Sequence, residues 1–502
     1  MISKSIQTVL LCVFVLLTST LTFAQDDRPT HKFNRQWLEE KAKELAAKEF
    51  VEPKLAPDSP LNNLNYDDYR KIQFQRGASV WKNEDRNFRL SPMHPGFLFK
   101  TPVKLNLVVG GTSRRILYTS DIFNYDKEQK AAKETQAEGY SGFKLTTPIN
   151  KPDVWDEFLV YQGGTYFRGL GKDNWYGLSA RGLAVNTAKP TGEEFPVFTE
   201  FWIERPKEQG QSIVIHALLE SASLTGAFTF KATPGENTEI EVNSALYPRK
   251  QIDSFGIGPL TSMFLYNGVN RTRFDDTRPA VHDSDGLFMI NSQNERIWRP
   301  LTNPRKLQVS AFGDKTLKGF GLFQRHRKFT DFEDMEAHYE ARPSAWVEPI
   351  GNWGPGHVEL VEIPTNSEIH DNIVAFWQPS EPMKANRAYS FQYKISWGSV
   401  FAVEDKGGRI LSTATGKALG SETVRDFVID YSSLNLPDDV VVSASASTGK
   451  IVGTIQKFMD KTGLYRVVVK FEPGREDLSE LRVSLSSKDK AWGETWLYRW
   501  NR

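Results

Sequence analysis

The segment from Phe274 to Leu287 (FDDTRPAVHDSDGL) concentrates acidic residues immediately before an apolar stretch. Asp283 and Asp285 alternate along it, and side chains two positions apart in an extended segment point to the same face. Two carboxyl groups in one cleft are what glycoside hydrolysis requires. An Asx-rich turn is the alternative interpretation. A calcium loop is not indicated, because the full ligand spacing with its distal Glu is absent.

A second acidic cluster runs from Glu368 to Trp377 (EIHDNIVAFW). Ile373–Trp377 is apolar and predicts a buried strand, which places Asp371 at the mouth of that strand. Partial desolvation of a carboxyl at such a boundary favours its protonated form, as a general acid requires. The alternative is that Asp371 and its neighbour Asn372 only end the preceding loop.

Several residues near these aspartates are candidate contacts for a sugar. Trp353 lies in the segment GNWGPG, whose glycines and proline predict a loop that presents the ring. Arg325 belongs to an Arg-His-Arg cluster that follows an apolar stretch and has hydrogen-bond donors for hydroxyl groups. The residues that flank the two aspartates complete the set of candidate substrate contacts: His282, Asp285, Glu368 and Trp377.

The sequence predicts neither a metal site nor a cofactor. His282 and His370 each lack a second ligand at helical or strand spacing. The glycines between Gly163 and Gly171 are not followed by a helix, so a dinucleotide fingerprint is rejected. A G-x-S-x-G nucleophile elbow is absent from the chain.

The elements that must position these residues are mainly strands. One helix is indicated at Asn34–Glu49, with Asn34 as its N-cap, and a short one at Lys127–Thr135. The rest alternates or forms short β-branched runs between turn residues, without a strand–helix rhythm. We therefore expect an all-β protein with an antiparallel sandwich architecture. The clearest strands are expected at 104–109, 213–219, 238–242, 466–470 and 481–485.

A chain of 502 residues is expected to form two domains. A polar, glycine-bearing link at 404–408 follows an aromatic strand that ends at Trp397-Gly398. The interpretation is a large β-sandwich over residues 25–400 and a small β-sandwich over residues 409–502.

The first 24 residues have the pattern of a general secretory signal peptide: Lys4, an apolar core from Val9 to Leu17, and a small residue at Ala24. Cys12, the one cysteine, lies within this core, so the mature chain is expected to contain no disulfide or thiol nucleophile. The net charge of +1 disfavours nucleic acid and anionic membranes as partners. A bacterial periplasm fits these features.

Six segments, taken together, resemble the OpgG/OpgD (MdoG/MdoD) family of periplasmic glucan biosynthesis proteins. They occur in the family's order through nearly the whole mature chain. The general secretory signal makes the chain more similar to the G branch. The segments are Leu64 to Ile72, Tyr166 to Gly171, Tyr176 to Ala184, Phe274 to Leu287, Asp371 to Trp377 and Glu494 to Trp500.

The resemblance implies a galactose-mutarotase-like β-sandwich followed by an immunoglobulin-like domain. It also implies a periplasmic role in making β-1,2-linked glucan with β-1,6 branches, and an inverting β-1,2-glucanase activity. By motif match Asp371 is the general acid, and Asp283 is the carboxylate on the base side, acting through hydroxyls and waters. Glu368 is expected to hold the acid or the substrate.

Two hypotheses of different class follow. The first is an inverting endo-β-1,2-glucanase that trims or shapes the glucan. The second is a non-catalytic glucan-binding or branching-assembly factor that works beside a membrane glucosyltransferase. A sugar epimerase, suggested by the fold alone, ranks third. A homodimer is an open alternative for the oligomeric state.

Overall fold

The computed structural model describes residues 30–404 and 407–502. The predicted signal peptide (1–24) and Cys12 lie outside the described residues. Strands dominate the chain, as expected for the all-β class, and three α-helices are described: α1 (Arg35–Ala46), α2 (Tyr66–Lys71) and α3 (Lys130–Glu134). None of the described helices is long and apolar enough to cross a bilayer.

The larger sheet has fifteen strands. In spatial order they are β1 (Thr30–Lys32), β5 (Thr112–Ile116), β4 (Lys104–Val109), β12 (Val197–Glu204), β13 (Ile213–Glu220), β14 (Leu224–Thr233), β15 (Thr238–Pro248), β26 (Tyr389–Gly398), β23 (Ser344–Ile350), β22 (Gly319–Phe323), β19 (Gly286–Ile290), β20 (Arg296–Pro300), β33 (Lys490–Asn501), β32 (Leu478–Ser487) and β29 (Val441–Ala446).

A ten-stranded sheet packs against the larger one. Its strands are β21 (Gln308–Asp314), β24 (Gly356–Glu362), β25 (Ile373–Pro379), β16 (Phe255–Ser262), β10 (Ser179–Arg181), β9 (Tyr166–Gly169), β8 (Asp156–Gln162), β7 (Gly142–Thr147) and β3 (Arg89–Met93), with β11 (Ala184–Val185) beside β16.

Three smaller sheets complete the fold. One has four strands, in the order β27 (Ile410–Lys417), β28 (Arg425–Ser432), β31 (Leu464–Glu472) and β30 (Lys450–Met459). The other two are the pairs β17 (Phe264–Tyr266) with β18 (Val281–His282) and β2 (Gln73–Phe74) with β6 (Phe123–Asn124).

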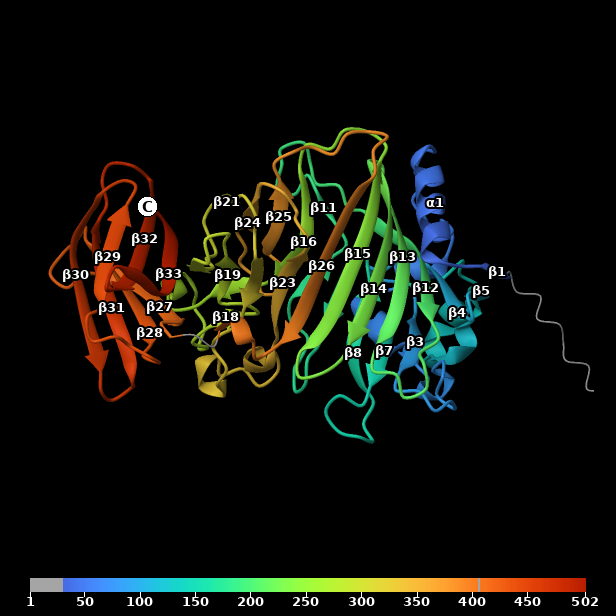
Figure 1. The fold of residues 1–502 in the computed structure, drawn as a ribbon. Helices are drawn as coiled ribbons and strands as arrows, with labels where there is room; N and C mark the ends of the chain where they lie inside the picture. The colour runs from blue at the N-terminus through green and yellow to red at the C-terminus, as the bar shows by residue number, and fades with distance from the viewer. Residues whose placement is uncertain (1–29, 405–406) are drawn as a thin grey trace, which may run out of the picture.

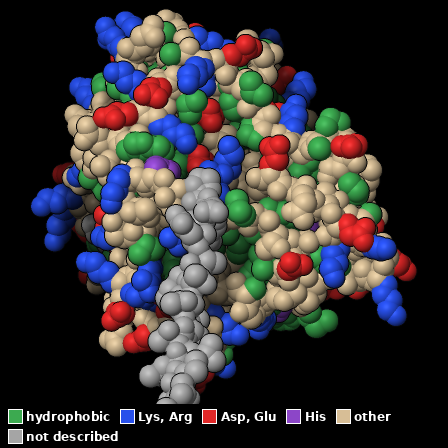
Figure 2. Space-filling view, turned by 90° about the vertical axis from the view of Figure 1, so that its right-hand side faces the viewer, with side chains coloured by type: hydrophobic (Ala, Val, Ile, Leu, Met, Phe, Trp, Pro, Cys, Tyr) green, Lys and Arg blue, Asp and Glu red, His purple; other side chains and the backbone are tan. Residues whose placement is uncertain are grey.

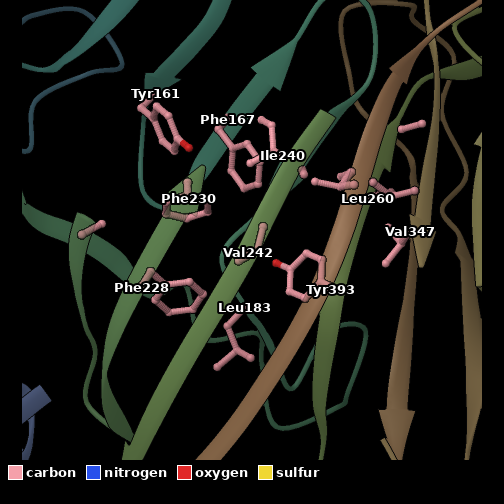
Figure 3. Packing of buried hydrophobic residues seen from close by; sticks show 14 of the residues in the cluster. Tyr161, Phe167, Leu183, Phe228, Phe230, Ile240, Val242, Leu260, Val347 and Tyr393 are labelled. Atoms are coloured by element: carbon pink, nitrogen blue, oxygen red, sulfur yellow. The ribbon is translucent and has the colours of Figure 1, made fainter. Parts of the chain in front are cut away.

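The main core lies between the two large sheets and is rich in aromatic rings. Figure 3 shows Tyr161 and Phe167, from β8 and β9, directed toward Phe230 of β14, and the Tyr161 ring lies 5.3 Å from each of the other two. Alternation along each strand produces this layer, because every second side chain faces the opposite sheet. On the outer face of the ten-stranded sheet, β3 and β7 carry the polar side chains of Ser91, Lys144 and Thr146, whereas β25 carries the buried Val374 and Phe376.

Helix α1 covers one face of the larger sheet at the end of the molecule far from the C-terminal strands (Figure 1). Asn34 caps it as expected, because its side chain accepts a hydrogen bond of 2.8 Å from the backbone N–H of Trp37. Leu38 and Ala42 are buried against Trp202 of β12, so the helix is stabilised by its apolar stripe.

The C-terminal strands form a second, smaller sandwich, drawn in orange and red in Figure 1. Its sheet β29-β32-β33 is continuous with the larger sheet, because β33 pairs with β20 in parallel: Thr495 opposes Ile297 and Trp496 opposes Trp298. Trp298, Trp496 and Phe427 share one buried cluster. The two sandwiches are therefore joined by strand pairing as well as by apolar packing.

Candidate functional site

Asp283 follows β18, and its backbone N–H donates a 2.8 Å hydrogen bond to the carbonyl of Met263. Its carboxyl is buried and accepts a hydrogen bond from the guanidinium of Arg342. Burial raises the pKa of Asp283 to about 6; Arg342 opposes this rise and the charge of Asp371 adds to it. The carboxyl is therefore half ionised near pH 6.

Arg342 is fixed on several sides before it reaches Asp283. Its Nε donates to the carbonyl of Ala337 at 3.0 Å, and its guanidinium carbon lies 4.3 Å from the centroid of the Tyr339 ring. Both partners lie in the turn that precedes β23, around the short 3₁₀ helix Tyr339–Ala341. The chain thus brings a cation from residue 342 to a carboxyl 59 residues earlier.

Asp371 lies in the loop between β24 and β25, and 34% of its side chain is exposed. Arg168 of β9 is its ionic partner, with 3.9 Å between the guanidinium and the carboxylate. The loop is fixed by the buried side chain of Asn372. Its amide oxygen accepts a 2.8 Å hydrogen bond from the N–H of Phe264, and its amide nitrogen donates to the carbonyls of Phe264 and Ile363. Asp371 is thus an accessible carboxyl on a well-anchored backbone.

Glu368 links the two aspartate-bearing loops. Its carboxylate accepts a 3.1 Å hydrogen bond from the Tyr339 hydroxyl and lies 2.9 Å from the guanidinium of Arg278. Burial raises the pKa of Tyr339 far above its ordinary value, and the carboxylates of Glu368 and Asp283 raise it further, so the phenol stays a proton donor. The Tyr339 hydroxyl is therefore a proton-carrying group near both carboxylates.

Asp285 is buried and has different partners from Asp283. One of its oxygens accepts from the backbone N–H groups of Arg325 at 2.5 Å and His326 at 3.0 Å, while the other lies 2.6 Å from Nδ1 of His326. Although burial opposes ionisation, the charges of His326 and His282 hold the pKa of Asp285 well below its ordinary value. In turn, Asp285 raises the pKa of His326 to about 9.

His282, Asp285 and His326 form the one group among the described residues whose ligand atoms are clustered as a metal ion needs, within 4.8 Å of one another. Two ligands of a tetrahedral zinc ion stand roughly 3.3 Å apart, given bonds of about 2.0–2.1 Å. The 2.6 Å contact between His326 and Asp285 is instead the length of a charge-assisted hydrogen bond. The arrangement therefore favours a proton shared between His326 and Asp285 over a bound metal ion.

Three predicted sugar contacts are not brought to this cluster. Arg325 is buried in ion pairs with Glu404 and Glu494, at 2.9 and 2.8 Å, and Trp377 is fully buried in the main core. Trp353 donates to the carbonyl of Gln392 and precedes β24, whereas Asp371 follows it. Because that seven-residue strand spans roughly 20 Å, Trp353 lies at the opposite end of the strand from the aspartates.

His282 and Asp285 flank Asp283 in the sequence and are also buried, so they pack beneath the site and are not exposed to a ligand.

Composition and local pattern did not indicate Arg342, Tyr339 or Arg168 as partners of the aspartates. Arg342 stands in an ordinary polar segment, HYEARP, and Tyr339 is a buried ring among many. The only available signal for Arg168 was its place in one of the segments that resemble the glucan biosynthesis family. Their roles depend on contacts between distant parts of the chain.

A cleft of about 860 Å³ lies on the outer face of the ten-stranded sheet, over β3, β7 and β8. Cross-strand pairing joins it to the aspartates, because Lys144 of β7 opposes Val160 of β8, which opposes Arg168 of β9. Glu157, at the edge of the cleft, accepts a 2.9 Å hydrogen bond from the hydroxyl of Tyr176. Lys144 at the cleft and Arg168, the partner of Asp371, therefore lie two strands apart on one face of the sheet, with Val160 between them.

Comparison with known proteins places these features in a family. The family model described as "Periplasmic glucan biosynthesis protein, MdoG" matches residues 33–500. The curated "Glucans biosynthesis protein G" of Vibrio cholerae is 44% identical over 478 residues, covering 94% of this chain and 87% of that protein. The protein of the same name from Shewanella frigidimarina is 45% identical over 475 residues, covering 94% and 85%.

Solved structures are more distant. A galactose mutarotase related enzyme from Lactobacillus acidophilus covers 52% of this chain and 96% of its own, with 8% identity and a TM-score of 0.22. A protein from Synechocystis covers 71% and 98%, with 8% identity and a TM-score of 0.18. At these scores the likeness carries no argument about function.

Proposed function

The chain belongs to the MdoG family of periplasmic glucan biosynthesis proteins, and from that premise we propose that it hydrolyses the β-1,2-linked backbone of a glucan with inversion at the anomeric carbon. One observation carries the proposal. A buried carboxyl with a raised pKa, Asp283, and an accessible carboxyl, Asp371, belong to one cluster, in which the charge of Asp371 contributes to the raised pKa of Asp283.

In this mechanism Asp371 protonates the glycosidic oxygen of the leaving sugar. A sugar bound over its exposed face displaces the remaining water from the carboxyl. The carboxyl then gives up its proton as the glycosidic bond breaks. Arg168, at 3.9 Å, stabilises the carboxylate that remains.

Asp283 acts on the opposite side as the final proton acceptor for the attacking water. Its carboxyl is buried behind Arg342, so the proton reaches it through hydroxyls and waters, for which the Tyr339 phenol is well placed. A pKa of about 6 gives a base that is ionised at neutral pH and still has appreciable proton affinity. A separation that leaves room for water between the carboxyls is typical of inverting enzymes.

Export to the periplasm through the signal at residues 1–24 is part of this proposal. The substrate is a neutral polymer, and the surface agrees with such a partner. Figure 2 shows one end of the molecule, where Lys and Arg side chains alternate with Asp and Glu rather than forming a field of one sign.

The test is Asp371→Asn and Asp283→Asn, assayed on linear β-1,2-glucan for new reducing ends, with products identified by mass spectrometry and the first-formed anomer by NMR. Asp438→Asn, an exposed carboxyl in the C-terminal sandwich, is the matched control. We expect loss of about 100-fold or more in kcat for both site variants, and α-anomers from the parent protein. Equal rates for parent and Asp371→Asn, or a β-anomeric first product, contradict the proposal.

A second candidate function is a glucan-binding assembly factor that contacts a membrane glucosyltransferase. The observation in its favour is a set of exposed apolar side chains on β29 and β30, the outer strands of the two C-terminal sheets: Val441, Val452, Ile455 and Phe458. Ile455→Lys, compared with Lys457→Ala on the same strand, tests co-purification with the synthase. This candidate is favoured if the parent protein binds glucan, releases no product, and loses the synthase only in Ile455→Lys.

A further inference from the structure

We infer that Trp175 and His338 form a stacking platform for one glucose unit of the glucan, at the rim of the aspartate cluster. The inference rests on the proposed function for the identity of the ligand. It adds a binding subsite made by two residues that neither the sequence motifs nor the family match indicates.

Trp175 is unusual because its ring is exposed. Among the residues that the structure describes, it is the one tryptophan that is largely exposed, with 55% of its surface accessible, while the others are buried or partly buried. Leaving so large an apolar ring in water forgoes the burial that usually stabilises it. An exposed aromatic ring close to a cluster of polar and ionisable groups is typical of a ligand contact.

The ring is exposed on a rigid backbone. The N–H of Trp175 donates to the carbonyl of Ala341 at 3.0 Å, and the side chain of Asn174 donates to the same carbonyl at 3.1 Å and to the Ser399 hydroxyl at 2.8 Å. The loop that carries Trp175 is therefore attached to the turn that carries Arg342. A preformed platform loses little conformational entropy when a ligand binds.

His338 completes the platform. Its ring lies 4.2 Å from the Trp175 ring with 34° between the planes, and its backbone has φ 47° and ψ 48°. A left-handed conformation is costly for a residue other than glycine. Here it begins the 3₁₀ helix that presents Tyr339 and Arg342, so the platform and the partners of Asp283 belong to one turn.

The geometry selects the ligand class. Glucose in a β-linkage presents axial C–H groups on its faces and hydroxyls around its edge. The ring of Trp175 suits a face. Tyr176, the next residue, reaches in the other direction to Glu157 at the edge of the cleft. A chain that crosses the aspartates therefore has the aromatic ring of Trp175 on one side and the polar pair of Tyr176 and Glu157 on the other.

The experiment measures glucan affinity and kinetics separately. Affinity for a linear β-1,2-glucan oligosaccharide is measured by calorimetry in the Asp371→Asn background, with Trp175→Ala, Trp175→Phe and His338→Ala added in turn. Phe458→Ala is the matched control, since it removes an exposed aromatic ring from the C-terminal sandwich. We expect Trp175→Ala to weaken affinity about threefold to tenfold, Trp175→Phe to restore most of it, and His338→Ala to weaken it by less.

In the otherwise unchanged protein the same Trp175→Ala substitution should raise KM with kcat nearly constant, because stacking binds substrate and transition state alike. Affinity that stays within twofold of the parent in Trp175→Ala overturns the platform, as does undetectable binding of any β-1,2-glucan. Failure of the hydrolase proposal has a different result: glucan binds and Trp175→Ala weakens it, but the parent releases no product.

Discussion

The ionisation of Asp283 depends on Arg342, and under the proposed function this dependence predicts the pH profile of glucan hydrolysis. Burial raises the pKa of Asp283 to about 6, and Arg342 is the group that opposes the rise through its charge and its hydrogen bond. Replacing Arg342 with Met removes both effects while keeping a side chain of similar length. The pKa of the carboxyl must then rise above 6.

The magnitude can be worked from this value. A carboxyl with a pKa of about 6 is ionised in roughly nine molecules of ten at pH 7. Loss of a buried ionic partner raises a carboxyl pKa by about one to two units. The ionised fraction at pH 7 then falls to between about a half and a tenth, so kcat/KM falls roughly twofold to tenfold from this cause alone.

The sign of the effect separates it from general damage. In the proposed mechanism Asp283 is the base-side carboxylate, so activity is expected to require its ionised form and to rise as the pH passes its pKa. In Arg342→Met the acidic limb of the kcat/KM profile should move to higher pH by about one pH unit or more. The difference in kcat/KM between the variant and the parent protein should become smaller toward pH 8.5. Arg342→Lys retains the charge and should leave the limb within a few tenths of a unit.

The assay is release of reducing ends from β-1,2-glucan between pH 4 and pH 9, with circular dichroism at each pH to confirm folding. A loss in Arg342→Met that is equal at every pH would show that Arg342 acts on substrate geometry and not on the ionisation of Asp283. A limb that moves to lower pH contradicts the electrostatic argument outright.

Three further predictions concern stability and loop position. The pKa of His326 in the folded protein is about 9, above its ordinary 6.5. The ion pair of His326 with Asp285 therefore stabilises the fold fully below pH 6.5, and this stabilisation is lost as the pH rises through 9. His326→Ala should lower the urea midpoint at pH 6 but not at pH 10. Glu494→Gln leaves the buried Arg325 with too little negative charge and should cost about 3–5 kcal/mol in urea unfolding. Asn372→Ala removes three hydrogen bonds beneath Asp371 and should lower kcat more than it raises KM, with glucan affinity as the control readout.

Features that depend on local pattern could be predicted from the sequence. The helix begins after its Asn34 cap as expected and ends at Ala46, three residues before the predicted end. There the hydrogen bonds tighten, because the N–H groups of Ala47 and Lys48 donate to carbonyls three residues earlier. The strand expected at 104–109 is β4 with the same bounds. The alternation of residues alone was enough to give the all-β class.

Predictions about exposure were weaker, because exposure depends on what packs over a residue. Trp353 was expected on a loop that presents its ring, yet the ring lies against Tyr393. Trp377 was a candidate sugar contact at the end of a predicted buried strand, and its ring is in the core. Trp175, in the polar segment GKDNWYG, had the same local signal and is the exposed ring. The exposure of an aromatic side chain on a loop depends on tertiary packing, which a single sequence does not show.

Asp283 and Asp285 were predicted to share a face, Asp283 as the base-side carboxylate and Asp285 as a substrate contact. Their partners in the structure show how their environments differ. Asp283 meets Arg342 at the open side of the cluster, whereas Asp285 receives the N–H groups of Arg325 and His326. Since the Arg325 side chain is held by Glu494 of β33, the backbone that orients Asp285 is attached to the C-terminal sandwich. The paired strands β20 and β33 make this attachment rigid. The C-terminal sandwich therefore contributes to the site by fixing the loop of the two aspartates, although Glu494 itself has no access to substrate.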